Sequence, residues 1–251
     1  MHTSPSKAPL VFEESKNYQM LTIKAGRPSF LNYMFIVFDS STNDAVVIDP
    51  GWDFEFLKRS LIDRRLILRG IFLTHSHQDH TAAAPELSRY FQCPIYISKV
   101  ELSISDYQAD MLVPFDHNDT IDAGSIKCKC ALTPGHTKGS ACFAIGRRFF
   151  TGDTVFIEGC GLCFGPTGST KDMFETLEYI KSTIPDDTEI HPGHRFHHDL
   201  GRDFKFVKSS NIYFRLSTHE AFNKFCNRSA RRGNAPPLVS SVKEGHAQLV
   251  E

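Results

Sequence analysis

One run of six residues, HSHQDH at positions 75–80, constrains this chain more than any other feature. It brings four metal-binding side chains together, namely His75, His77, Asp79 and His80. Imidazole and carboxylate groups are ligand types that hold zinc and related divalent ions. We expect an irregular loop here, because no regular helix or strand points all of these groups inward. The apolar residues 71–73 predict a short buried strand before the loop, and residues 81–87 predict the start of a helix after it. The alternative is a polar surface turn rich in histidine.

Three further short strands are each predicted to end in a glycine-containing turn that carries a histidine or an aspartate. These turns are TPGHT at 133–137, TGDT at 151–154 and HPGH at 191–194. Proline and glycine end a strand and let the backbone come close to a ligand. Taken singly, Asp153 is more typical of a turn residue, and His136 of a solvated or core histidine. Taken together, the turns indicate one metal-binding site.

The motifs HSHQDH, PGHT, TGDT and PGH, in this order and at these separations, resemble the metallo-β-lactamase superfamily in its glyoxalase II-like branch. The segment GDTVFIEGCG at 152–161 looks like that branch, as do Asn32-Tyr33 and AVVIDPG at 45–51. This resemblance covers residues 17–195. More narrowly, FIEGCG at 156–161, MFE at 173–175 and NIYF at 211–214 resemble the zinc-dependent hydrolases encoded beside trans-acyltransferase polyketide synthases.

The resemblance implies an α/β fold, the four-layer αβ/βα metallo-β-lactamase sandwich, with the metals at one edge of the sheets. The hydrophobic pattern agrees with two sheets covered by helices. Strands are predicted at 20–24, 33–38, 45–48, 71–73, 94–97, 126–132, 141–145, 148–150 and 188–190. Helices are predicted at 53–62, 171–183, 203–209 and 216–228, the first of them capped through its acidic start.

Geometry and the family pattern together predict which residues bind which metal. The first ion would be bound by His75, His77 and His136, the second by Asp79, His80 and His194, with Asp153 bridging the two. His191 competes with His194, but the Pro-Gly turn and the family's P-G-H pattern favour His194, which leaves His191 a supporting role. Nitrogen and oxygen ligands suit two zinc ions best, while iron and manganese stay open.

Composition limits the kinds of protein that this chain can form. With 251 residues and 41% hydrophobic content, the chain can bury one large core. The net charge of -1 argues against a nucleic-acid or membrane surface driven by bulk charge, and no apolar run approaches a membrane span. Residues 1–16 are mostly polar and predict a flexible lead without a signal sequence, so we expect a cytoplasmic protein. Seven cysteines in irregular spacing do not suggest a disulfide framework.

We expect a basic helical extension at 196–232 and a disordered tail at 233–251. A basic surface there would suit an anionic substrate arm or an acidic protein partner, although an ordinary solvated face explains it equally well. Candidate substrate contacts are Arg195, Lys205, Cys160 and Leu162. Cys160 and Cys163 form a C-x-x-C pattern, which we interpret as a loop beside the active site rather than a redox pair.

The predicted reaction is hydrolysis of an acyl thioester by a metal-activated hydroxide, with Asp79 orienting the hydroxide while binding its metal. The narrower resemblance implies an acyl chain on the phosphopantetheine of an acyl carrier protein. Hydroxyacylglutathione hydrolase (glyoxalase II) is the first alternative. A persulfide dioxygenase with one iron is the second, and Leu162 departs from the basic residue of that family's pattern. A non-catalytic scaffold is disfavoured, because every ligand position carries a competent residue. A true β-lactamase and an RNA-processing phosphodiesterase are disfavoured as well.

Overall fold

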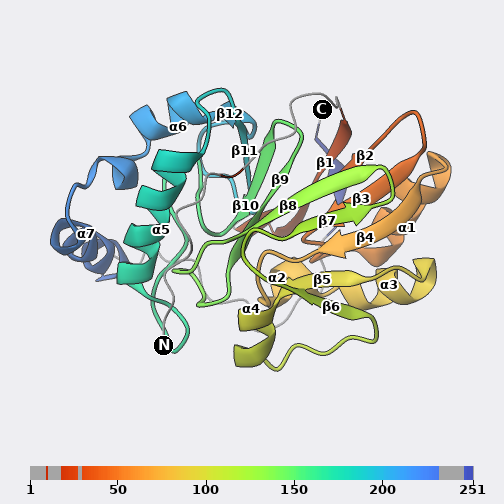
Figure 1. Cartoon of the computed structure of the whole chain (residues 1–251), viewed down its shortest axis with the longest axis horizontal. Helices are drawn as coiled ribbons and strands as arrows, with labels where there is room; N and C mark the ends of the chain where they lie inside the picture. Colours follow the sequence, from red (N-terminus) through yellow and green to blue (C-terminus); the bar gives the residue numbers. More distant parts are fainter. Residues whose placement is uncertain (1–9, 11–17, 28–29, 232–245, 251) are drawn as a thin grey trace.

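A computed structural model of the chain describes residues 10, 18–27, 30–231 and 246–250, and these residues form two mixed β-sheets packed face to face (Figure 1). The first sheet has seven strands in the order β13-β1-β2-β3-β4-β5-β6, and the second has six in the order β12-β11-β10-β9-β8-β7. The strands of the first sheet are β1 (Gln19–Arg27), β2 (Phe30–Phe38), β3 (Asp44–Ile48), β4 (Ile67–Phe72), β5 (Ile95–Ser98), β6 (Leu112–Phe115) and β13 (Gln248–Leu249). Those of the second are β7 (Thr120–Ala123), β8 (Ile126–Leu132), β9 (Ala141–Ile145), β10 (Arg148–Gly152), β11 (Glu189–Pro192) and β12 (Arg202–Asp203).

Helices cover the outer faces of both sheets. The helices are α1 (Phe54–Asp63), α2 (Gln78–Thr81), α3 (Ala84–Phe91), α4 (Lys99–Ile104), α5 (Thr170–Thr183), α6 (Phe204–Ser210) and α7 (His219–Arg231), with a 3-10 turn η1 (Ile212–Arg215). Helices α1 and α3 lie against the first sheet, and α5, α6 and α7 lie on the side of the second (Figure 1). The predicted four-layer sandwich is therefore confirmed.

Three buried clusters of apolar side chains correspond to the three interfaces between these layers. Strand β10 shows how one sequence serves two of them. Phe149 packs with the helices α5 to α7, whereas Phe150 packs between the sheets, where its ring lies 5.1 Å from that of Phe35. Successive side chains of a strand point to opposite faces of the sheet, so a strand buried on both sides is apolar throughout.

The predicted helix starts are explained by their capping residues. Asp53 accepts a hydrogen bond from the backbone N–H of Phe56 at the start of α1, and Ser169 does the same for Asp172 at the start of α5. Such caps satisfy backbone donors that the first turn of a helix leaves unpaired. Helices α6 and α7 lie within one to three residues of their predicted limits. Helix α4 and the strands β6, β7 and β12 were not predicted.

Two expectations about local structure are wrong. The metal motif is only partly an irregular loop, because Asp79 and His80 lie in the helical turn α2. The tail 233–251 is not disordered throughout, since β13 pairs antiparallel with β1 and the N–H of Val250 donates to Thr22 O at 2.9 Å. An edge strand offers unpaired backbone groups, which explains how a strand of two residues can add there. Residues 232–245 and most of the expected flexible lead 1–16 lie outside the described residues. Within the described part of the chain, no helix is both long and apolar enough to cross a membrane.

Candidate metal centre

The predicted ligands follow the C-terminal ends of four strands, one in the first sheet and three in the second, and meet at one edge of the sandwich. His75 and His77 follow β4, and Asp79 and His80 come from the adjoining turn α2. The second sheet contributes the remaining ligands after β8, β10 and β11, namely His136, Asp153 and His194. Grouped by mutual proximity of their ligand atoms, these residues form three overlapping sets: His75, His77 and His136; His75, His80 and Asp153; and Asp79, His80 and His194.

The first cluster consists of three imidazoles. Nδ1 of His77 lies 3.0 Å from Nε2 of His75 and 3.0 Å from Nε2 of His136. A tetrahedral ion with metal–nitrogen bonds of 2.0–2.1 Å would separate its ligand atoms by about 3.3 Å. The three nitrogens therefore already have nearly the spacing of one face of a zinc coordination tetrahedron.

The second cluster combines two imidazoles with a carboxylate. Oδ2 of Asp79 lies 3.5 Å from Nε2 of both His80 and His194. Asp153 lies between the two clusters: its Oδ1 is 3.3 Å from Nε2 of His80 and 3.4 Å from Nε2 of His194, while its Oδ2 is 3.6 Å from Nε2 of His136. Oδ1 of Asp153 is buried and has no hydrogen-bond partner. One oxygen facing each cluster is the arrangement that a bridging ligand requires, so the residues fit two divalent ions.

Four of the imidazoles are held through Nδ1, which leaves Nε2 to face the cluster. The Nδ1 partners are Thr74 Oγ1 for His75 (3.0 Å), Asp49 Oδ2 for His80 (3.0 Å), Leu162 O for His136 (2.7 Å) and Leu31 O for His194 (2.8 Å). A carbonyl or carboxylate can only accept, so for the last three Nδ1 carries an N–H, and Nε2 carries the lone pair whenever the ring is neutral. For His77 the roles reverse, because Nδ1 faces the cluster.

Burial lowers the pKa of His75 and of His77, and the neighbouring imidazoles lower both further. Neutral imidazole is the form that binds a metal ion, so these two side chains are prepared as nitrogen ligands at neutral pH. His75 and His77 thus need little proton release on binding.

The second cluster has the opposite electrostatic character. Burial would raise the pKa of Asp79 and of Asp153, but the adjacent His80 and His194 outweigh burial and hold both values below the ordinary range. Burial would lower the pKa of the two imidazoles, yet the carboxylates raise that of His80 and raise that of His194 to about 9. The two ionised carboxylates favour positive charge beside them, and the imidazolium groups provide it. A divalent cation bound at this position would provide that charge instead of the imidazolium protons.

Residues outside the ligand motifs fix the second cluster. The indole N–H of Trp52 donates to Asn32 Oδ1 at 3.0 Å, and Asn32 Nδ2 donates to Asp79 Oδ2 at 2.9 Å. A β-carbon on Gly193 would lie 2.5 Å from Cε1 of His80, so only glycine allows this close approach. Asn32 was noted in the sequence as part of the family pattern, but without a role, and Trp52 was missed.

His191 lies apart from the clusters. Its ring stacks on Phe150 with centroids 5.4 Å apart and meets the edge of Phe35 at 5.5 Å, while Nε2 lies 3.4 Å from Glu189 Oε2. It therefore supports the strand β11 between the sheets, and His194 occupies the position in the cluster.

The four candidate substrate contacts divide into two groups. Leu162 and Cys160 belong to the loop beside the first cluster, where the Leu162 carbonyl binds His136 and Cys160 is half-buried against the outer core. Arg195 directly follows His194, is exposed and pairs with Asp199 at 2.8 Å.

Lys205 was predicted to contact substrate, and its position does not support this. Its backbone N–H donates to Asp186 O, which precedes β11, whereas His194 follows that strand. At about 3.3 Å per residue, the two ends of this segment are on the order of 20 Å apart.

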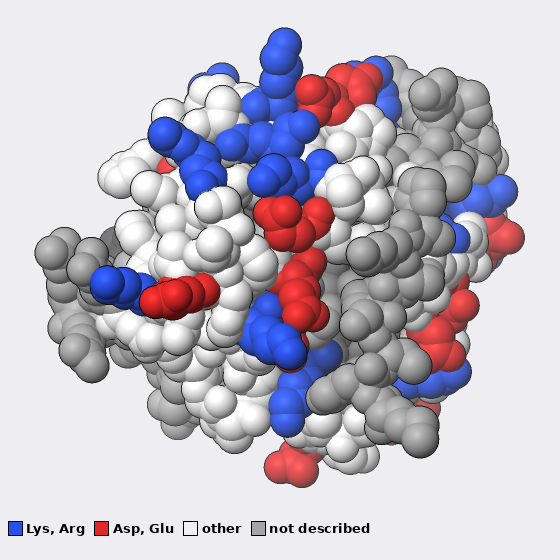
Figure 2. All heavy atoms as spheres, turned by 60° about the vertical axis from the view of Figure 1, so that its left-hand side comes forward, with Lys and Arg blue, Asp and Glu red and all other residues white. Residues whose placement is uncertain are grey.

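Lys and Arg side chains do gather near the top of the molecule, at the height of α6, with acidic side chains among them (Figure 2). In α6, Lys208 pairs with Asp186, so part of the positive charge of this helix is neutralised.

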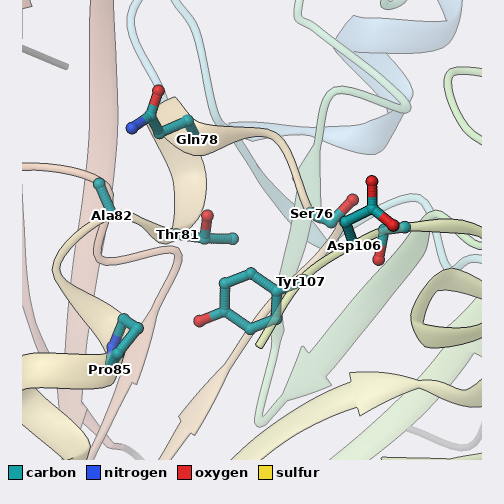
Figure 3. Close-up of a pocket in the computed structure, with 8 residues that line it drawn as sticks. Ser76, Gln78, Thr81, Ala82, Pro85, Asp106 and Tyr107 are labelled. Atoms are coloured by element: carbon teal, nitrogen blue, oxygen red, sulfur yellow. The ribbon is translucent and has the colours of Figure 1, made fainter. Parts of the chain in front are cut away.

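A pocket of about 400 Å³ adjoins the metal motif (Figure 3). Its wall includes Ser76 and Gln78, which alternate with the ligands His75, His77 and Asp79 along the chain. The other lining residues are Thr81, Ala82, Pro85, Ser105, Asp106 and Tyr107. Its size falls within the range of pockets that bind small molecules.

Comparison with known proteins agrees with this geometry. A model of the metallo-β-lactamase superfamily matches residues 26–194, which include all seven predicted ligands. The chain belongs to the metallo-β-lactamase superfamily.

Two curated relatives and one solved structure illustrate its place in that superfamily. The chain is 35% identical to PksB of Bacillus subtilis (strain 168), described as a "Probable polyketide biosynthesis zinc-dependent hydrolase", over 86% of this chain and 96% of the relative. It is 29% identical to a hydroxyacylglutathione hydrolase of Shewanella halifaxensis (strain HAW-EB4), over 84% of this chain and 78% of the relative. Its fold is similar to the crystal structure of ETHE1 from Myxococcus xanthus, with a TM-score of 0.73 and 26% identity over 89% of this chain and 93% of the other. The predicted resemblance is confirmed, and family, relatives and ligand clusters together support a metal-dependent hydrolase.

Proposed function

We propose that this protein is a dinuclear metal-dependent hydrolase that cleaves acyl thioesters, with an acyl chain on a carrier protein as its substrate. The observation that carries the proposal is Asp153, whose two oxygens face two separate ligand clusters. A centre for two ions supports hydrolysis better than a reaction that needs a single redox-active ion.

The chemistry depends on what the bound ions supply and on what the chain itself does. Two divalent ions would lower the pKa of water to about 7 and polarise the substrate carbonyl. Asp79 is fixed by Asn32 and can accept a hydrogen bond from the attacking water, which sets the direction of attack. A thiolate is a good leaving group, so thioester cleavage does not require a strong general acid from the protein.

The choice of substrate rests on the relatives and on the site's surroundings. PksB, which is described as a polyketide biosynthesis hydrolase, aligns with this chain over nearly its whole length. The pocket beside the metal motif has room for part of an acyl chain (Figure 3). Arg195, which directly follows His194 and is exposed, is the basic residue that we propose for contact with the phosphate of a carrier's arm.

A competition between two thiol carriers tests this proposal. Zinc-loaded protein is incubated with the same acyl group attached either to a phosphopantetheinyl carrier protein or to glutathione, and thiol release is followed. We expect a higher kcat/KM with the carrier protein. His136→Ala protein, which lacks a predicted ligand of the first ion, should show no turnover above the uncatalysed rate. If neither thioester is cleaved by the loaded wild-type protein, the proposed function is wrong.

Hydroxyacylglutathione hydrolase activity is the second candidate, because a curated relative with that description matches most of this chain. Preference for the glutathione thioester in the same experiment would select it. A persulfide dioxygenase would instead contain one iron per chain and consume oxygen with glutathione persulfide. A count of two zinc ions per chain, without oxygen consumption, would exclude that reaction.

A further inference from the structure

A buried glutamate in a segment without any predicted metal ligand touches both loops of the first cluster. Glu101 lies in α4 and is 1% exposed. Its Oε1 accepts hydrogen bonds from the backbone N–H of Ser76 at 2.9 Å and from the Ser76 hydroxyl at 2.6 Å. Its Oε2 accepts a hydrogen bond from the Thr137 hydroxyl at 2.6 Å. Nothing in the sequence motifs had drawn attention to this residue.

The two partners of Glu101 stand directly beside ligands. Ser76 lies between His75 and His77, and Thr137 follows His136. The first loop extends from the first sheet, and the second loop extends from the second sheet. One carboxylate therefore joins the two loops whose imidazole nitrogens must lie about 3 Å apart.

Backbone packing holds the contact between Glu101 and the two loops in place. Ser98 caps α4 by accepting a hydrogen bond from the Glu101 N–H at 3.0 Å, and its hydroxyl donates to Gly139 O at 2.6 Å. A β-carbon on Gly139 would lie 2.1 Å from the Glu101 nitrogen, so the loop after His136 packs directly on the start of α4. Both ends of the contact are therefore fixed by the main chain, and the Glu101 side chain has little freedom.

The second cluster is held by other groups. Asp79 is bound by Asn32, His80 by Asp49 and His194 by the Leu31 carbonyl, and none of these partners belongs to α4. A change at Glu101 should therefore affect the two clusters unequally.

We infer that Glu101 is a positioning residue for the first metal ion: it sets the spacing of His75, His77 and His136 without binding the ion. The inference concerns metal affinity, so it stands or falls independently of which thioester the protein hydrolyses. Outer partners of ligands commonly change metal affinity 10–100-fold. Because Glu101 acts through the neighbours of the ligands, we expect a decrease of about tenfold in first-site affinity for Glu101→Ala.

Two variant proteins, each of which retains one ligand cluster, separate the effect of Glu101 on the first cluster from its effect on the second. His194→Ala removes a ligand of the second cluster and leaves the first, whereas His136→Ala leaves the second. Metal-free protein of each background, with and without Glu101→Ala, is titrated with Zn²⁺ against a competing chelator. We expect Glu101→Ala to weaken zinc binding about tenfold in the His194→Ala background and less than about threefold in the His136→Ala background. Equal weakening in both, or no weakening in either, would overturn the inference.

Two further variants separate positioning from charge and from general destabilisation. In Glu101→Gln the amide oxygen can still accept both bonds from Ser76, and the amide N–H₂ can donate to Thr137, so near-normal affinity is expected. Affinity as low as that of Glu101→Ala would mean that charge, not positioning, is responsible. Asp44→Ala removes another buried carboxylate, one that accepts a hydrogen bond from the Ser125 N–H far from the ligands. It should lower the melting temperature without changing zinc affinity, and a tenfold loss of affinity there would also overturn the inference.

Discussion

The change of Asp49 to asparagine tests whether the ligands are oriented as the hydrogen bonds indicate. Asp49 is 3% exposed, and its Oδ1 accepts a bond from the Thr74 N–H at 2.8 Å. Its Oδ2 accepts bonds from the Thr74 hydroxyl at 2.7 Å and from His80 Nδ1 at 3.0 Å. All three neighbours donate. An asparagine has nearly the same shape, but one of its two positions must also donate.

Either orientation of the new amide is unfavourable. With the amide N–H₂ at the former Oδ1, it faces the Thr74 N–H, and a buried donor without an acceptor costs about 1–3 kcal/mol. With N–H₂ at the former Oδ2, it donates to His80 Nδ1, which moves the imidazole hydrogen to Nε2, the atom that faces the metal. The Thr74 hydroxyl would then turn toward His75 Nδ1 and affect that ligand similarly. Loss of such a partner weakens metal binding about 10–100-fold, or about 1.4–2.8 kcal/mol.

The zinc-loaded Asp49→Asn protein should therefore be less stable by about 1–3 kcal/mol, whichever orientation the amide adopts. For a chain of this size each kcal/mol lowers the melting temperature by about 2–4 °C, so a decrease of about 2–12 °C is expected at fixed free zinc. Differential scanning calorimetry measures it, and chelator competition shows whether affinity changes as well. Asp203→Asn is a control for the same chemical change, because the Asp203 side chain caps α6 by accepting a bond from the Phe206 N–H, where asparagine serves equally well. Wild-type stability and wild-type zinc affinity together in Asp49→Asn would refute the proposed orientation of the ligands.

Three further outcomes are expected. Gly193→Ala places a β-carbon 2.5 Å from His80 Cε1, so elemental analysis should find about one zinc per chain instead of two. Ala82→Leu fills the pocket beside the metal motif; steady-state kinetics should show a higher KM for long acyl thioesters and an unchanged KM for acetyl thioesters. Burial would raise the pKa of Asp44, but the Arg69 hydrogen bond outweighs it and the net pKa is lowered. A lowered folded-state value stabilises the fold above about pH 4 and loses this effect as pH falls, so urea midpoints of wild type and Asp44→Asn should converge at low pH.

The ligands could be predicted from sequence because their chemistry is local. HSHQDH contains four of them, and each of the other turns combines glycine with one histidine or aspartate at the ligand position. The strand pattern then predicts that these turns follow strand ends. The helical turn at Asp79 and His80 was not predicted, because its four residues are too few to show a helical period.

The partners of the ligands could not be predicted in the same way, because they are distant in sequence. Asn32 lies 47 residues before Asp79, and Asp49 lies 31 residues before His80. Glu101 is 25 residues from Ser76 and 36 from Thr137. Each is a single polar residue in or beside an apolar segment, and neither period nor spacing distinguishes it from a turn or cap. The same limit applies to Lys205, since basic composition does not show which end of β11 a helix covers.

Each cluster draws ligands from both sheets, and this has a consequence for stability. The first combines His75 and His77 from the first sheet with His136 from the second, and the second combines α2 with His194. At the same edge, a hydrogen bond from Tyr33 N–H to Gly193 O at 2.8 Å crosses between the sheets. An ion in either cluster therefore links the two halves of the sandwich, and binding only to the folded chain adds about 2.7 kcal/mol per site at a hundredfold excess over Kd. The clusters are thus part of the interface between the sheets as well as candidate metal sites. Glu101 lies at this interface because it binds Ser76, in the loop from the first sheet, and Thr137, in the loop from the second.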